Sequence, residues 1–197
     1  NAAFFTIFYV PMVPIIIFIF KRESIHWSVW PSVFLCVIGG YLLTNFQDAT
    51  IRLGDTLVVL GALFWSTHII FTGLMVKKYN LPLTVGATQT LIVSLFSFII
   101  GSIYEEFIFK NILNEIYSIL YAGILSGGIA FVLQIYAQRN ITPAPAAIIF
   151  SLEGVFATIA AWFLLNQLLN INNLLGCFFI LCGVLLSQLL PLIKKKA

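Results

Sequence analysis

Charged side chains are scarce in this chain of 197 residues: only 9% are charged, whereas 61% are hydrophobic. The mean hydropathy is +1.06. A soluble domain of this length could not cover so much apolar surface with polar groups. Seven segments instead have about the 20 apolar residues that a helix needs to cross a bilayer core. These segments are Ala2–Phe20, Val29–Thr44, Leu57–Val76, Leu83–Ile103, Ile116–Ala137, Ala146–Leu165 and Leu174–Ile193.

Several other patterns are missing as well. No alternation of apolar and polar residues runs through the segments, which argues against a β-barrel. Cys36, Cys177 and Cys182 have no metal-type spacing and predict no disulfide framework. No basic patch is interleaved with exposed aromatic residues, so the formal charge of +3 does not indicate binding to nucleic acid. We therefore predict an all-α, polytopic helical membrane protein with seven transmembrane helices and no metal or cofactor.

The few charges outside the spans predict how the chain is oriented. If the first span runs inward, eight basic residues fall on the cytoplasmic side and two on the outer side. The eight are Lys21, Arg22, Lys77, Lys78, Arg139 and Lys194 to Lys196, and the two are Arg52 and Lys110. The positive-inside rule then places the first residue outside and the C-terminus in the cytoplasm of a cell-membrane protein.

An internal repeat relates the first two spans to the last two. Shifting the chain by 144 positions pairs Ala2 with Ala146 and Gly39 with Gly183, among six identities. The identities are few for two apolar helices. However, the Ala-Ala opening, the short polar hinge and the late glycine keep one register without a gap, as in transporter repeats.

The paired spans run in opposite directions, so each repeat needs an odd number of spans. We expect five per repeat, with residues 1–45 as the last two helices of the first repeat and 53–193 as the second repeat. The chain would then hold helices 4–10 of a ten-helix protein built from two inverted halves (5+5). It opens in apolar sequence without Met or a basic signal-peptide region, so we expect three further helices before Asn1.

Four stretches carry a resemblance to a known family. They are NAAFFTIFYVPMVPIIIFIFKRE at Asn1–Glu23, LGDTLVVLGALFWSTHIIF at Leu53–Phe71, the run from Ile119 to Gln167 containing RNITPAPAAIIFSLEG, and LLGCFFILCGVLLSQL at Leu174–Leu189. In this order they resemble the EamA family of the drug/metabolite transporter superfamily. The resemblance implies a ten-helix permease with two inverted five-helix halves and cytoplasmic termini. It also implies secondary transport of a small metabolite such as an amino acid, and it favours export.

Two positions depart from the family pattern. The family usually has Ser-Leu-Glu-Pro in its ninth helix, whereas Gly154 takes the proline place here. An acidic residue usually ends that helix, and Asn166 and Gln167 replace it. The first repeat keeps Lys21, Arg22 and Glu23 at the equivalent turn.

Glu153 is the main candidate for a functional residue. It is a lone carboxylate in the apolar segment Ala146–Leu165, and an ionisable group at membrane depth costs at least ~2.5 kcal/mol. It lies about seven residues inside the cytoplasmic end of that segment, or about 10 Å deep. We predict that it lines a substrate pathway, and the alternative is a protonated acid bonded to a neighbouring helix. Its helical face also carries Ala146, Phe150, Ala157 and Ala160.

Five other residues are weaker candidates for the same pathway. His68 lies well inside its span with Trp65 one turn before it, but a neutral histidine satisfied within the core is the slightly preferred explanation. Gln89 and Gln134 are polar groups within spans that either face substrate or form interhelical hydrogen bonds. Tyr9 occupies the place of Glu153 in the first repeat, which makes it a candidate for the opposite wall.

Three functions compete for such a chain. The first is a permease that works by alternating access on a small-molecule metabolite, with protons as a candidate coupling ion. The second is an intramembrane enzyme that uses Glu153 and His68 as an acid–base pair, although zinc-protease and serine-hydrolase motifs are missing. The third is a seven-helix receptor or retinal protein. A retinal protein needs a lysine in its last span to form the Schiff base, and Leu174–Ile193 contains none. We favour the permease, which is not an enzyme.

Overall fold

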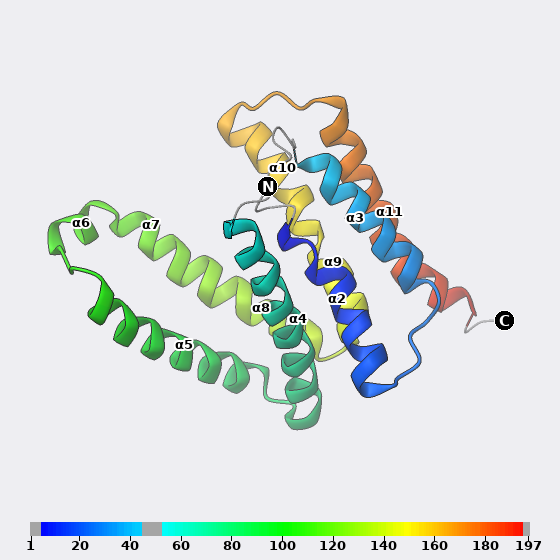
Figure 1. Cartoon of the computed structure of the whole chain (residues 1–197), viewed down its shortest axis with the longest axis horizontal. Coiled ribbons are helices and arrows are strands. Elements are labelled where there is room, and N and C mark those ends of the chain that lie inside the picture. Colours follow the sequence, from blue (N-terminus) through cyan, green and yellow to red (C-terminus); the bar gives the residue numbers. More distant parts are fainter. Residues whose placement is uncertain (1–4, 45–52, 195–197) are drawn as a thin grey trace. The chain divides into compact units, whose positions relative to one another are not determined.

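The computed structural model describes residues 5–44 and 53–194, and all regular structure within them is helical (Figure 1). The helices are α2 (Tyr9–Ile16) with its π-helical continuation η1 (Ile17–Lys21), α3 (Val29–Leu43), α4 (Leu53–Tyr79), α5 (Pro82–Tyr104), α6 (Phe109–Asn114), α7 (Ile116–Leu120), the π-helical η2 (Tyr121–Ala130), α8 (Phe131–Gln138), α9 (Pro143–Phe150), α10 (Leu152–Leu165) and α11 (Ile171–Lys194). The predicted features at Ala2, Ala3, Arg52, Lys195 and Lys196 lie outside the described residues.

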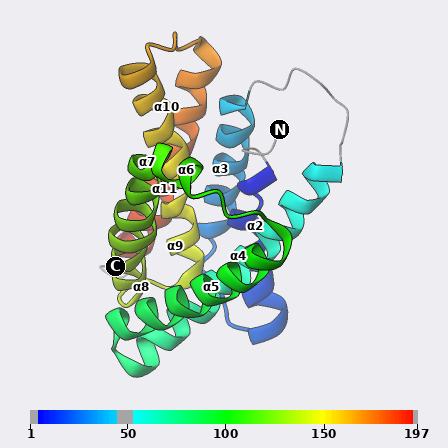
Figure 2. The same ribbon diagram turned by 90° about the vertical axis from the view of Figure 1, so that its left-hand side faces the viewer.

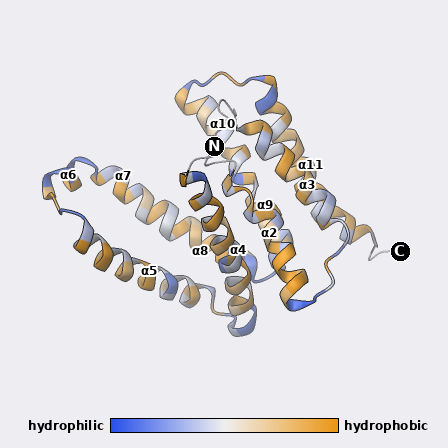
Figure 3. Cartoon of the chain, viewed as in Figure 1, coloured by the Kyte–Doolittle hydropathy of each residue, from blue (hydrophilic) through white to orange (hydrophobic). Residues whose placement is uncertain are grey.

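Among the described residues, five helical segments are long and apolar enough to cross a membrane, which supports a polytopic membrane protein. They are Leu53–Tyr79, Pro82–Tyr104, Ile116–Gln138, Pro143–Leu165 and Ile171–Ile193. Hydrophobic residues dominate these helices, and hydrophilic ones gather at the connections (Figure 3). The other two predicted spans form shorter apolar helices, Tyr9–Lys21 and Val29–Leu43. The 15 residues of α3 extend about 22 Å, less than a bilayer core of about 30 Å.

Helix α9 begins earlier than the apolar pattern predicts. Pro143 supplies its first turn, where a missing N–H and a fixed φ are tolerated, so the span starts three residues before Ala146. Glu153 is consequently the eleventh of 23 residues in the span Pro143–Leu165. It therefore lies about 15 Å along the helix from Pro143, compared with about 10 Å from Ala146.

The chain packs into two compact units. The first consists of the chain up to Phe71 and from Thr142 onward, and the second is Thr72–Ile141. The units cut across the two predicted repeats, because the predicted second repeat contributes to both.

In the first unit, α3 and α11 lie side by side (Figures 1 and 2). A Cβ added to Gly39 would stand 2.6 Å from the carbonyl oxygen of Gly176, and one added to Gly183 would stand 2.8 Å from that of Ser32. In the repeat, which has an offset of 144 residues, Ser32 corresponds to Gly176 and Gly39 corresponds to Gly183. The two close contacts are therefore exchanged copies of each other, as across a local two-fold axis.

Two further backbone features repeat at the same offset. The N–H of Val10 donates to the carbonyl of Ile7 at 2.9 Å, and that of Gly154 donates to Ser151 at 3.2 Å, each three residues back rather than four. At the helix ends, Arg22 (φ 51°) and Asn166 (φ 52°) both adopt the left-handed conformation. The paired helices thus share their irregularities although their lengths differ, since α3 has 15 residues and α11 has 24.

The core of the first unit lies where α2, α3, α9 and α11 meet. Its fully buried side chains include Val10, Val13, Cys36, Ile148 and Ile180. Most large apolar side chains on the outer faces of the helices are exposed instead. Such a surface suits a hydrocarbon environment and would not suit water.

The second unit is held together by α5 and α8. A Cβ on Gly86 would lie 3.3 Å from Ile135 and 3.4 Å from Val132, so the glycine lets the two helices approach closely. The span Ile116–Gln138 becomes π-helical over Tyr121–Ala130, where a backbone carbonyl accepts a hydrogen bond from the N–H five residues later in the chain.

Candidate functional site

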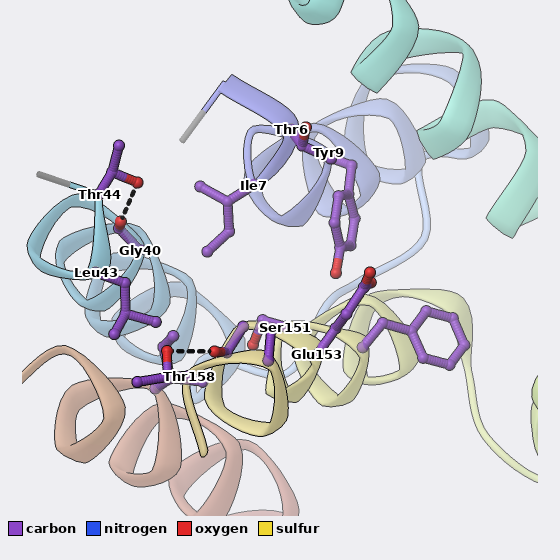
Figure 4. A pocket seen from close by; sticks show the side chains of 13 residues that line it. Thr6, Ile7, Tyr9, Gly40, Leu43, Thr44, Ser151, Glu153 and Thr158 are labelled. Atoms are coloured by element: carbon purple, nitrogen blue, oxygen red, sulfur yellow. Dashed lines mark hydrogen bonds between the residues drawn. The ribbon is translucent and has the colours of Figure 1, made fainter. Parts of the chain in front are cut away.

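A cavity of about 510 Å³ opens within the first unit (Figure 4). Helices α2, α3, α9, α10 and α11 supply its walls. Its lining residues are Thr6, Ile7, Tyr9, Gly40, Leu43, Thr44, Phe150, Ser151, Glu153, Gly154, Ala157, Thr158 and Ile180. The volume falls in the usual range for small-molecule sites, roughly 300–1,000 Å³.

Glu153 reaches the cavity because its helix is interrupted just before it. Ser151 separates α9 from α10, and its hydroxyl donates to the carbonyl of Ile148 while contacting the Cys36 sulfur at 3.4 Å. Gly154 then donates its N–H to Ser151. A proline at this position, as in the family pattern, would lack that donor. The interruption is therefore present here without the proline.

Tyr9 faces Glu153 across the cavity. Its phenol oxygen and the Glu153 carboxylate point toward one another in Figure 4. Helix α2 presents the tyrosine after an irregular turn of its own, because Pro11 has no N–H to give to Ile7 and Val10 supplies one instead. The tyrosine side chain is buried, with 5% of its surface exposed, whereas Glu153 is exposed.

Three hydroxyl groups in the wall donate to carbonyls of their own helices. Thr44 bonds to Gly40 at 3.0 Å, and Thr158 bonds to Gly154 at 2.8 Å, both drawn as dashed lines in Figure 4. Ser151 makes the third such bond. Thr6 and Tyr9 add two further hydroxyls, and the rest of the wall is apolar apart from Glu153, which carries the only formal charge among the described residues that line the cavity.

Trp65 and His68 form a separate feature on α4. Their rings stack with centroids 4.9 Å apart and planes 16° from parallel, one turn apart on the helix. Both are half-buried, and neither is among the residues that line the cavity. The arrangement does not bring His68 and Glu153 into one pocket, as an acid–base pair would require.

Gln89 and Gln134 belong to the second unit. Gln89 on α5 lies one turn after Gly86, and Gln134 on α8 is next to Ile135, so both lie close to the contact between these helices. Both side chains are half-buried. This position suits an interhelical role as well as a pathway role.

The predicted face around Glu153 is only partly in the cavity. Phe150 and Ala157 line it together with Glu153, whereas Ala146 is buried in the core and Ala160 is exposed elsewhere. The break at Ser151 shifts the helical register, so a uniform spacing of three and four fails across it.

The cavity also contains polar residues that sequence reasoning missed, namely Thr6, Thr44, Ser151 and Thr158. The repeat could have identified the first of them. An offset of 144 pairs Thr6 with Phe150, Ile7 with Ser151 and Tyr9 with Glu153, and all six residues line the cavity.

Metal ligands do not gather anywhere in the described part of the chain, where no group of three His, Cys, Asp or Glu side chains could hold an ion. Cys36, Cys177 and Cys182 are free thiols.

The amino-acid sequence is similar to those of known transporters. A sequence profile described as the EamA-like transporter family matches residues 52–189. The uncharacterized transporter YoaV of Bacillus subtilis is 26% identical over 159 residues, which cover 78% of this chain and 52% of YoaV. An uncharacterized transporter of Archaeoglobus fulgidus is 28% identical over 192 residues, or 96% of this chain and 60% of the relative.

A plant protein is similar too. Protein WALLS ARE THIN 1 of Arabidopsis thaliana is 26% identical over 147 residues, which cover 72% of this chain and 37% of that protein. The chain thus matches less than two thirds of each of these relatives. The profile match includes α9, α10 and most of α11, and therefore Glu153.

Proposed function

Because the chain belongs to the EamA-like transporter family, we propose that it is part of a membrane permease that carries a small metabolite through the cavity around Glu153. The mode is secondary transport by alternating access across the cell membrane, in the direction of export, and an amino acid is one substrate of suitable size. The observation that carries the proposal is a carboxylate at the middle of a membrane span, facing a cavity of ligand size.

The proposed architecture is that of inverted repeats. Residues 1–45 would complete a first repeat and residues 53–193 would form the second, giving seven spans that correspond to helices 4–10 of a ten-helix protein. The features repeated at an offset of 144 support this, above all the exchanged contacts of Gly39 and Gly183. The charge bias supports an orientation with the C-terminus in the cytoplasm.

The proposed roles follow from position. Glu153 contacts substrate from α10, and Tyr9 forms the opposing wall. A proton on Glu153 is the proposed coupling ion, because this carboxylate carries the only formal charge in the described wall of the cavity. Trp65, His68, Gln89 and Gln134 are proposed as further contacts along the pathway.

Reconstitution tests the proposal. The full-length protein would be placed in liposomes and screened with labelled metabolites over a range of pH, comparing wild type with Glu153→Gln. We expect transport to fall by at least about tenfold and to lose its pH dependence, since losing a charged hydrogen bond costs roughly 1.5–3 kcal/mol.

Glu106→Gln is the matched control, because it makes the same chemical change at an exposed residue between α5 and α6. It should transport as wild type does. Normal transport by Glu153→Gln at every pH would show that this carboxylate is structural.

A further inference from the structure

The wall of the cavity is unbalanced in charge. Among its described residues it holds one carboxylate and no Lys, Arg or His. An ionised carboxylate at mid-span is costly unless a positive partner accompanies it. A ligand that carries its own positive charge would supply that partner, whereas a carboxylate or phosphate ligand would add repulsion.

The wall is also unbalanced in hydrogen-bonding groups. Each hydroxyl has one proton to donate and two lone pairs to accept with. Thr44, Ser151 and Thr158 have committed their protons to backbone carbonyls, so only their lone pairs remain for a ligand. The Tyr9 hydroxyl points toward the Glu153 carboxylate. Four of the six polar side chains in the described wall, those of Thr44, Ser151, Glu153 and Thr158, therefore offer acceptors to a ligand, beside the hydroxyls of Thr6 and Tyr9.

The rest of the wall accommodates an apolar body. Ile7, Leu43, Phe150 and Ile180 supply aliphatic and aromatic surface around the polar groups. Tyr9 and Phe150 add aromatic rings to this wall, and aromatic rings attract cations.

From these observations we propose that the cavity recognises a primary ammonium group on a small apolar body, with Glu153 as its counter-ion. An ammonium group has three donors and no acceptor, which complements a wall of acceptors. The inference rests on the proposed function, since it names the substrate class of the same site. A free amine should bind best, its amino acid less well and the corresponding acid least.

Three probes with one body test this: phenethylamine, phenylalanine and 3-phenylpropanoate. Binding would be measured by calorimetry on the purified full-length protein, and export of each labelled probe would be measured in liposomes. We expect the amine to bind at least about tenfold more tightly than the acid. Glu153→Gln should remove most of this preference, while Glu106→Gln should keep it.

The outcomes separate the two proposals. Equal binding of the three probes, tighter binding of the acid, or no binding of the amine would overturn the ammonium inference, whether or not transport occurs. Binding of the amine that depends on Glu153, without movement of any probe or metabolite, would support the ammonium site and contradict the permease. The comparison of probes on wild type needs no variant, so a misfolded Glu153→Gln protein would not obscure the result.

Discussion

The crossing of α3 and α11 predicts a specific loss of stability on adding one methyl group. In Gly39→Ala, the new Cβ would lie 2.6 Å from both the Gly176 carbonyl oxygen and the Ile180 side chain, and 3.0 Å from the Ile180 backbone nitrogen. Real Cβ atoms do not approach other atoms so closely. Two of these neighbours are backbone atoms, so relief requires the helices to move apart. Overpacking of this kind costs about 1–3 kcal/mol.

Gly61→Ala provides the matched control. Gly61 also lies inside a helix of the first unit, α4, but nothing lies within 4 Å of a Cβ placed there. Both variants gain roughly 0.5–1 kcal/mol because alanine favours helix over glycine. That gain cancels in the comparison, and the difference between the variants reports the clash. It corresponds to about a 5- to 140-fold change in the unfolding equilibrium constant.

The measurement is reversible unfolding of the purified protein in mixed micelles of increasing SDS content, followed by tryptophan fluorescence and circular dichroism. We expect Gly39→Ala to unfold at a lower SDS fraction than wild type and Gly61→Ala at the same fraction or a higher one. Equal stability of the two variants would refute the close approach of α3 and α11.

Two further predictions use the charged residues at the helix ends. The ion pair between Lys21 and Glu23 is short, at 2.7 Å, but its side chains are 32% and 60% exposed. Glu23→Ala should therefore change the free energy of unfolding by less than about 1 kcal/mol in the same titration. A larger loss would mean that the pair is shielded from water. Lys77 and Glu106 flank α5, so single cysteines at these places in a cysteine-free background should label from opposite sides of the membrane. Labelling of both from one side in intact cells would contradict the proposed topology.

The sequence predicted five of its seven spans well, because the apolar length of a span is a direct consequence of bilayer thickness; the other two, Tyr9–Lys21 and Val29–Leu43, form shorter helices. Helix ends were less predictable. Pro143 and Asp55 are not apolar, so a hydropathy pattern excludes them, yet both suit the first turn of a helix. The short helix α3 shows the opposite limit, since apolar composition alone does not reveal where a helix stops.

The candidate site was predictable in part. Glu153 is conspicuous as a lone charge, and the repeat register indicated Tyr9 opposite it. Ser151 and Thr158 were missed because hydroxyl residues are common in membrane helices and bond to their own backbone. These two residues line the cavity. The break at Ser151 is made by local hydrogen bonds, which the spacing of apolar residues in the sequence does not predict.

The paired glycine contacts limit which motions the first unit can make. Two backbones held in direct contact at Gly39 and Gly183 leave no room for sliding, since any shift along either helix drives a carbonyl into the opposing chain. Rotation about the point of contact remains available. If the proposed permease works by alternating access, we expect its helices to turn about this crossing, with Gly39 and Gly183 staying in contact with the opposing helix while Tyr9 and Glu153 move apart.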